Sequence, residues 1–219
     1  EGQKIIGWRD VPVVESSIGV TAASTMPNIK QIFIEKAENC ENFELKLYII
    51  RRLIEKAVVD SSIKNKDNFY IPSMSSRVTV YKGLLLAEQV GAFYPDLNDE
   101  SMKSAIALVH QRYSTNTFPS WDLAQPFRYL AHNGEINTIK GNNNWMSARE
   151  TVLNNSVYGS EIAKLFPITN PSNSDSANLD HAFELLIASG KSIADSIAML
   201  VPAAWEKDST MPQNVKDFY

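Results

Sequence analysis

The sequence predicts an α+β fold in one domain, and three observations carry this prediction. Short runs rich in β-branched and aromatic residues, bounded by Pro, Gly or Ser, occur in the first half. Apolar residues at helical spacing occur in several longer segments. A length of 219 residues, with 44% apolar and 21% charged side chains, suits one globular domain whose core needs no disulfide.

Short strands are predicted in the first half of the chain. The β-rich runs cover 32–34, 69–71, 77–81 and 84–86. Gly83 fits a hairpin turn between the last two runs.

The segment 43–58 predicts a helix that packs on the sheet. Its apolar side chains recur at steps of three and four residues, at Phe43, Leu47, Ile50, Ile54 and Ala57. This spacing leaves Lys46, Arg51 and Glu55 facing solvent.

In the middle of the chain, two predicted strands each lead into a polar segment. The run 105–109 is almost continuously apolar, as in a strand buried on both faces, and it precedes the polar stretch 110–122. A second strand at 127–131 precedes His-Asn-Gly-Glu at 132–135. Polar groups are therefore expected at the ends of buried strands.

Helices are predicted for most of the remaining chain. The segment 136–150 is helical in pattern but rich in Asn, and 179–190 has an apolar face after cap residues at 174–176. A third helix begins after Ser192 and ends at Pro202, and the polar tail 206–219 is expected to be loosely held.

Charge and composition exclude several functional classes. The net charge of −4 gives no long-range attraction for nucleic acid or anionic lipid. No apolar run has the length of a membrane span or of a signal peptide. A single cysteine, Cys40, favours a reducing intracellular setting. The start at Glu1, within an expected strand, suggests processing or truncation.

The usual metal and phosphate motifs are absent from the sequence. The histidines, at 110, 132 and 181, show no ligand spacing, and the glycines form no phosphate-binding loop. Cys40 lies between the anionic Glu38 and Glu41, which disfavours a reactive thiolate. No metal site is predicted, and Cys40 is interpreted as an inert thiol.

Three signals allow both a structural and a functional interpretation. Arg112 follows a predicted buried strand and suits either a salt bridge or bidentate capture of a carboxylate. Asn133 and Gly134 suit a tight turn, or an oxyanion hole made of an amide and an unobstructed backbone N–H. Asp175 suits a helix cap or a partner for a substrate ammonium.

These signals combine in a family resemblance. The strings HQRYSTNTFPSWDLAQPFRYLAHNGEINTIKGNNNWMSARE at 110–150 and SNSDSANLD at 172–180 resemble the class II, N-terminal-nucleophile glutamine amidotransferases, in the form of the glutaminase domain of glutamate synthase large subunits. Supporting matches at 7–13, 69–85 and 200–208 extend the resemblance over the whole chain, so residues 1–219 are expected to be part of one such domain.

The resemblance implies a fold, a substrate and site residues. The family's fold is an αββα four-layer sandwich, here incomplete at its N-terminus. Arg112 matches the residue that holds the α-carboxylate of L-glutamine, and Asp175 the residue that receives the α-ammonium. Asn133 and Gly134 match the oxyanion hole. The mouth of the pocket would be lined by Tyr113, Ser114 and Thr115.

The resemblance also implies groups that these residues lack. The family's nucleophile is an N-terminal cysteine, which this chain does not contain, so the segment alone is expected to be inactive. The parent enzyme would use FMN and an iron-sulfur cluster, neither of which has a site here. Its partners would be a synthase domain in the same polypeptide and ferredoxin or an NAD(P)H-linked small subunit, in the cytoplasm or a plastid.

Two alternatives remain open at the level of sequence. A non-catalytic module that binds glutamine or glutamate would keep the charged residues without a thiol. A hydrolase built from Ser114, His132 and Asp175 is the other, although no Gly-x-Ser-x-Gly motif surrounds any serine.

Overall fold

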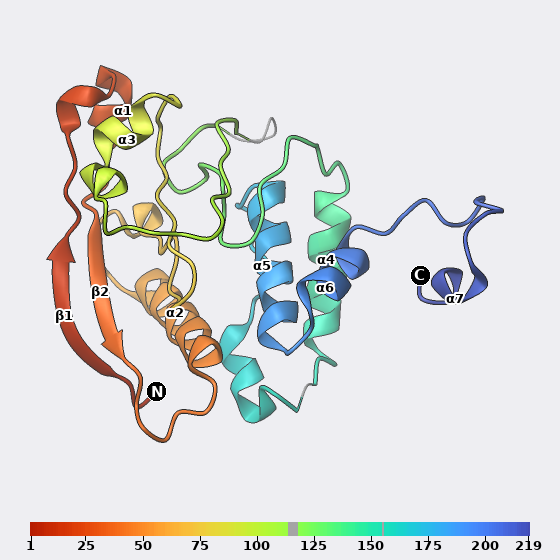
Figure 1. The fold of residues 1–219 in the computed structure, drawn as a ribbon. Coiled ribbons are helices and arrows are strands. Elements are labelled where there is room, and N and C mark those ends of the chain that lie inside the picture. Colours follow the sequence, from red (N-terminus) through yellow and green to blue (C-terminus); the bar gives the residue numbers. More distant parts are fainter. Residues whose placement is uncertain (114–117, 155) are drawn as a thin grey trace.

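A computed structural model of the chain describes residues 1–113, 118–154 and 156–219 and confirms a mixture of helices and strands (Figure 1). The strands are β1 (Lys4–Asp10) and β2 (Lys30–Glu35). The α-helices are α1 (Val20–Ser24), α2 (Phe43–Asp60), α3 (Gln89–Phe93), α4 (Ile139–Glu150), α5 (Asp175–Ala188), α6 (Ile193–Leu200) and α7 (Gln213–Lys216). Short 3-10 turns lie at Glu15–Ser17, Lys66–Asn68, Pro95–Asn98 and Gly159–Leu165.

The described residues form a single two-stranded sheet. β1 and β2 pair antiparallel, with a register shift between Ile5 and Gly7, and β2 contains the predicted strand 32–34. One sheet of two strands does not show the expected four-layer sandwich.

The other predicted strands are wrong. The segments 69–71, 77–81, 84–86, 105–109 and 127–131 contain no strand. The run 105–109 is not buried either, because Ile106 is 84% exposed and Val109 is 82% exposed. Apolar, β-branched composition predicted strands here, but a strand also needs a neighbouring backbone to pair with.

In two of these predicted strands, backbone N–H groups donate to side chains instead of to a neighbouring strand. Ser75 Oγ accepts from Val78 N–H at 3.2 Å, and Ser73 Oγ accepts from Val80 N–H at 3.2 Å. In the segment 127–131, the N–H of Tyr129 donates to Asp180 Oδ1 at 2.9 Å. Such local bonds compete with strand pairing.

Gly83 lies under an aromatic ring rather than in a hairpin turn. A Cβ atom at this position would lie 2.3 Å from Cζ3 of Trp121. The absence of a side chain therefore allows the indole ring to pack against the backbone, and the hairpin prediction is wrong.

The helix α2 forms as predicted, but its buried face agrees with the prediction only in part. Leu47 is buried as expected, and Leu45, Tyr48 and Ile49 are buried as well, whereas Ala57 is exposed. Arg51, which was expected to face solvent, is 1% exposed. Periodicity located the helix, but ion pairs with buried carboxylates bring this arginine inside.

The three predicted C-terminal helices are confirmed as α4, α5 and α6. The tail adds the short helix α7, which Figure 1 shows extending away from the other helices.

Two apolar clusters hold the fold. The first core comprises Val11, Ala22, Phe93, Tyr94 and Trp121. The second core joins α2, the turn Gly159–Leu165 and α5, and comprises Leu45, Tyr48, Ile49, Tyr158, Ile162, Leu165, Ile168 and Leu185. The helix α5, which begins at Asp175, is therefore anchored in the second core.

Candidate functional site

The N-terminus of α5 places Asp175. Ser174 is the cap residue, and its Oγ accepts from Ala177 N–H at 3.1 Å, so Asp175 is not itself the cap. Asp175 is 2% exposed, and its Oδ1 accepts from Ser176 N–H at 2.6 Å. Its other oxygen, Oδ2, accepts from Ile136 N–H at 3.0 Å. The cap thus fixes a buried carboxylate at the positive end of a helix.

The segment 129–136 crosses this end of α5 and is held by three of its side chains. Asp180 accepts from Tyr129 N–H at 2.9 Å, and Asp175 accepts from Ile136 N–H. Between them, Nε2 of His132 lies 2.7 Å from Ser176 Oγ. The candidate oxyanion-hole residues Asn133 and Gly134 lie within this tethered segment.

His132 links Gly134 to Asp175. Gly134 N–H donates to His132 Nδ1 at 3.1 Å, so Nδ1 carries no proton and Nε2 carries one. Nε2–H then donates to Ser176 Oγ, and the Ser176 hydroxyl donates to Asp175 Oδ1 at 3.0 Å. The structure therefore connects two predicted site residues, and it engages the Gly134 N–H that was expected to be unobstructed.

The same geometry does not present His132 as a base toward Ser176. Its Nε2 donates to Ser176, so it does not accept the proton of that hydroxyl. Ser176 is also fully buried. Ser114, the serine of the predicted triad, lies outside the described residues.

His110 links Arg112 to Asn133. Arg112 N–H donates to His110 Nδ1 at 3.0 Å, and His110 Nε2 lies 2.8 Å from Asn133 Oδ1. Arg112 and Asn133 are both exposed, as a site open to a small ligand requires. Four of the seven predicted site residues thus form two pairs linked by hydrogen bonds, Arg112 with Asn133 and Gly134 with Asp175, and the pairs are joined by the peptide between Asn133 and Gly134.

Tyr113 is the one described member of the predicted pocket mouth. Its hydroxyl donates to the backbone oxygen of Gly83 at 2.8 Å. Burial, with the nearby charge of Asp122, raises the pKa of Tyr113 to about 12, so the hydroxyl remains a donor at neutral pH. Ser114 and Thr115 lie outside the described residues.

Sequence reasoning did not single out His110, Ser176 or Asp180 as site residues. A repeated spacing was available as a signal, because a histidine lies two positions before a predicted site residue in His110-Gln-Arg112 and in His132-Asn-Gly134. In the structure, both of these histidines accept the N–H of that residue. A histidine placed two residues before a candidate ligand residue is therefore worth inspecting.

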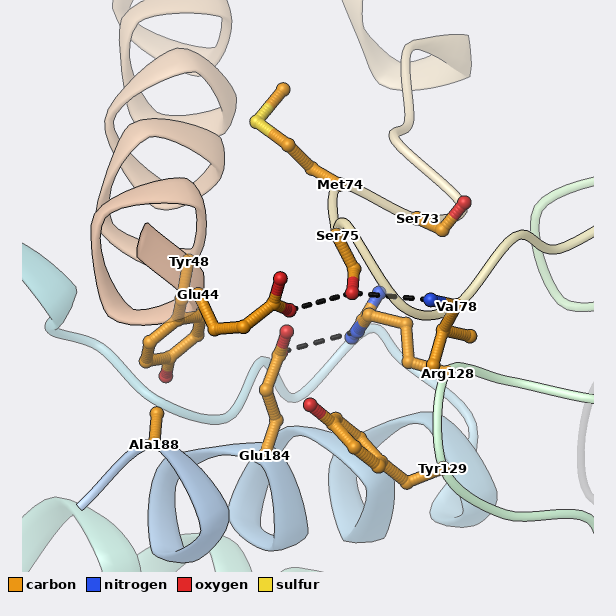
Figure 2. A pocket seen from close by; sticks show the side chains of 10 residues that line it. All are labelled: Glu44, Tyr48, Ser73, Met74, Ser75, Val78, Arg128, Tyr129, Glu184 and Ala188. Carbon is orange, nitrogen blue, oxygen red and sulfur yellow. Dashed lines mark hydrogen bonds and ion pairs between the residues drawn. The ribbon is translucent and has the colours of Figure 1, made fainter. Parts of the chain in front are cut away.

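A small cavity lies between α2 and α5, apart from the predicted site residues (Figure 2). Its volume is about 30 Å³, which is enough for a water molecule or two but not for glutamine. Figure 2 shows Arg128 beside Glu184, joined to it by a dashed line. Nε of Arg128 lies 3.1 Å from Glu184 Oε2. Burial raises the pKa of Glu184, and the charges of Arg128 and Arg51 oppose this rise.

Among residues 1–113, 118–154 and 156–219, no three His, Cys, Asp or Glu side chains gather as a metal site would require. In the described part of the chain, no helix combines the length and apolar character needed to cross a membrane.

The chain is similar to known proteins along its whole length. The chain matches the family described as glutamine amidotransferases class-II over residues 1–219. It is 50% identical over 217 residues to the glutamate synthase (NADPH) large chain of Azospirillum brasilense, covering 98% of this chain and 14% of that protein. It is 48% identical over 225 residues to the chloroplastic ferredoxin-dependent glutamate synthase 2 of Arabidopsis thaliana, covering 100% of this chain and 14% of that protein. The chain spans about 14% of the length of both relatives.

Proposed function

The chain belongs to the class II glutamine amidotransferases, and from this premise we propose that it is part of the glutaminase domain of a glutamate synthase. The reaction of this domain is the hydrolysis of L-glutamine to glutamate and ammonia. The domain's complete fold, in this proposal, is the αββα sandwich.

One observation supports the assignment of the site most strongly. Hydrogen bonds run from the backbone N–H of Arg112 through His110 to Asn133, and from Gly134 through His132 and Ser176 to Asp175, and they bring together the segments that carry these four residues. A cation, an amide, a backbone N–H and a carboxylate are the groups that an amino acid with a side-chain amide requires. Arg112 would bind the α-carboxylate of glutamine and Asp175 its α-ammonium.

The chemistry begins with attack of a cysteine thiolate on the δ-carbonyl carbon of glutamine. A C–S bond forms, and the negative charge moves to the carbonyl oxygen, where Asn133 and Gly134 donate hydrogen bonds. The C–N bond then breaks, and the amide nitrogen leaves as ammonia after accepting the proton that the cysteine thiol gave up. Water hydrolyses the thioester, which releases glutamate and regenerates the thiol.

Gly134 has to exchange its hydrogen-bond partner during this reaction. Its N–H donates to His132 Nδ1 in the structure, and it would donate to the oxyanion in the transition state. The change replaces a neutral acceptor with an anionic one, which forms the stronger hydrogen bond.

Cys40 does not fit the role of nucleophile. It is 8% exposed and lies before α2, whereas the candidate site lies at the N-terminus of α5. We therefore assign the reaction to a cysteine that is not among these 219 residues. An active preparation must contain that cysteine together with this chain.

The remaining groups of the parent enzyme are assigned outside this chain. Ammonia would aminate 2-oxoglutarate in a synthase domain of the same polypeptide, with FMN and an iron-sulfur cluster supplying electrons. A single cysteine cannot provide the thiolate ligands of such a cluster, so no step here passes through it. Ferredoxin or an NAD(P)H-linked subunit would be the electron donor, in a plastid or in the cytoplasm.

Replacing Asn133 with Ala tests the proposed site. In the full-length protein, N133A is expected to lower glutaminase turnover by roughly 10² to 10³, because one oxyanion donor is lost. Steady-state release of glutamate measures this loss. The exposed Asn39, in the loop before α2, supplies a matched N39A control with unchanged turnover. Normal turnover in N133A would contradict the assignment.

Replacing Arg112 with Lys tests the binding of the substrate. R112K is expected to raise the KM for glutamine, because a point charge cannot reproduce a bidentate contact with a carboxylate. An unchanged KM would remove Arg112 from the binding site. Binding of glutamine without turnover in the full-length protein would instead identify a non-catalytic binding module.

A further inference from the structure

His110 contacts both the candidate carboxylate-binding residue and the candidate oxyanion donor. Its Nδ1 accepts from the N–H of Arg112 at 3.0 Å, and its Nε2 lies 2.8 Å from Asn133 Oδ1. His110 is half-buried, whereas Arg112 and Asn133 are exposed. It is therefore less exposed than the two residues that would meet the substrate.

The contact with Arg112 fixes the tautomer of His110. A backbone N–H only donates, so Nδ1 must be the nitrogen without a proton. In the neutral imidazole the proton then lies on Nε2, which must face an acceptor. The only acceptor on the Asn133 side chain is Oδ1, and this requirement sets the orientation of its amide group.

The orientation of this amide decides whether Asn133 favours or opposes the reaction. With Oδ1 held by His110, the Nδ2 amino group is the half of the amide that remains to donate to an oxyanion. A rotation of 180° about the last side-chain bond would present the carbonyl oxygen, which repels negative charge. The backbone of Arg112 thus controls, through one imidazole ring, a donor in the oxyanion hole.

We propose that His110 is a positioning residue that holds the amide of Asn133 with its amino group directed toward the oxyanion. This inference rests on the proposed function, because it assigns a purpose to the same site. His110 itself exchanges no proton with the substrate.

Two substitutions at His110 separate positioning from general structure. H110F keeps a planar ring but neither nitrogen, whereas the side-chain amide of H110Q offers an acceptor for Arg112 N–H and a donor for Asn133 Oδ1. In the full-length protein, H110F is expected to lower kcat by roughly 10- to 100-fold, part of the effect of losing the donor itself. The KM for glutamine should change by less than about 3-fold, and H110Q should recover most of the activity.

A double-substitution cycle tests whether His110 acts through Asn133. The variant H110F/N133A is expected to be no slower than N133A alone, because there is no amide left to orient. Gln111, which is exposed between the two contact residues, gives a Q111A control with unchanged turnover. The proposal would be overturned if H110F lowered kcat by the same factor in the wild type and in N133A.

The same set of variants distinguishes failure of this inference from failure of the proposed function. If N133A lowers glutaminase turnover and H110F does not, only the role of His110 is overturned. If turnover is unchanged in N133A, the proposed site itself is overturned. A measurement that does not depend on folding of H110F is ¹⁵N NMR of the wild-type imidazoles. It should show His110 protonated at Nε2 and not at Nδ1, and the opposite tautomer would overturn the proposal.

Discussion

Lys82 is a buried cation in a largely apolar setting. It is 8% exposed, and its Nζ lies 4.9 Å from the ring centroid of Phe127 and 5.5 Å from that of Tyr70. Nζ also donates to the backbone oxygen of Asp122. Burial, together with the charge of Arg128, lowers the pKa of Lys82 to about 8.

This lowered pKa makes the stability of the chain depend on pH. Between pH 8 and the ordinary lysine value of 10.5, the unfolded chain binds more protons at Lys82 than the folded chain. The free energy of unfolding must therefore rise with pH in this window. Below pH 8, the folded chain bears the full cost of burying the charged Lys82 ammonium.

K82M is expected to remove this dependence. The stability of the wild type relative to K82M should increase by about 2 kcal/mol from about pH 7.5 to about pH 9.5, as the buried ammonium loses its proton. Urea unfolding of both proteins at the two pH values measures the difference. Both proteins contain the same tyrosines, so the effect of tyrosine titration cancels when the free energy of unfolding of K82M is subtracted from that of the wild type at each pH. A constant difference would show that Lys82 titrates normally.

At the scale of elements, α5 is the platform on which the candidate site is built. Its side chains hold the segment 129–136, and Ser174 caps its first turn. S174A is expected to cost about 1 kcal/mol in stability, because the buried Ala177 N–H loses its acceptor. It should also raise the KM for glutamine, since Asp175 follows the cap directly. Urea unfolding and steady-state kinetics measure the two effects.

Ser192 provides a matched control at the start of α6. Its Oγ accepts from Asp195 N–H at 3.0 Å, in the same capping geometry. S192A should lower stability by a similar amount, about 1 kcal/mol, and leave the KM unchanged. A raised KM in both variants would indicate that the effect comes from general loosening.

The sequence predicted the helices far better than the strands. A helix satisfies its own backbone, so periodicity and caps located α2, α5 and α6. A strand depends on a neighbour that may be distant in sequence, and local signals do not report whether one is present. In the segments 77–81 and 127–131, Ser73, Ser75 and Asp180 took the backbone donors instead.

At the scale of the whole molecule, buried ion pairs join distant parts of the chain. Arg51 on α2 pairs with Glu184 on α5, and Arg128 pairs with Glu184 at 3.1 Å and with Asp180 at 3.0 Å. Arg51 also pairs with Glu55 at 2.6 Å. Arg51 and Arg128 thus compensate the cost of burying the negatively charged carboxylates on α5.

R51M is expected to destabilise the chain by about 3 to 5 kcal/mol, because the buried Glu184 carboxylate loses one of its two arginine partners. The exposed pair of Lys4 and Glu35, 3.0 Å apart, gives a control. K4A should cost less than about 1 kcal/mol. Urea unfolding measures both variants, and equal losses would show that burial of Arg51 adds nothing.

The candidate site could be predicted only in part. Arg112, Asn133, Gly134 and Asp175 were predicted as site residues because their strings resemble a family, and hydrogen bonds in the structure link them through His110, His132 and Ser176. His110 carries no recognisable spacing to Asn133, which lies 23 positions later. A contact of this kind depends on how the chain folds back, so residue patterns within one segment do not reveal it.

The bond between His110 and Asn133 spans the junction of the two cores. Tyr113 is tied to the first core because its hydroxyl donates to Gly83, which packs against Trp121. The segment 129–136 is tied to the second core because α5, which holds it, packs in that core. A relative slide of the cores by about an ångström would break the 2.8 Å contact and misalign the reacting groups. If the proposed function holds, faulty packing in either core would therefore lower glutaminase turnover before it unfolds the protein.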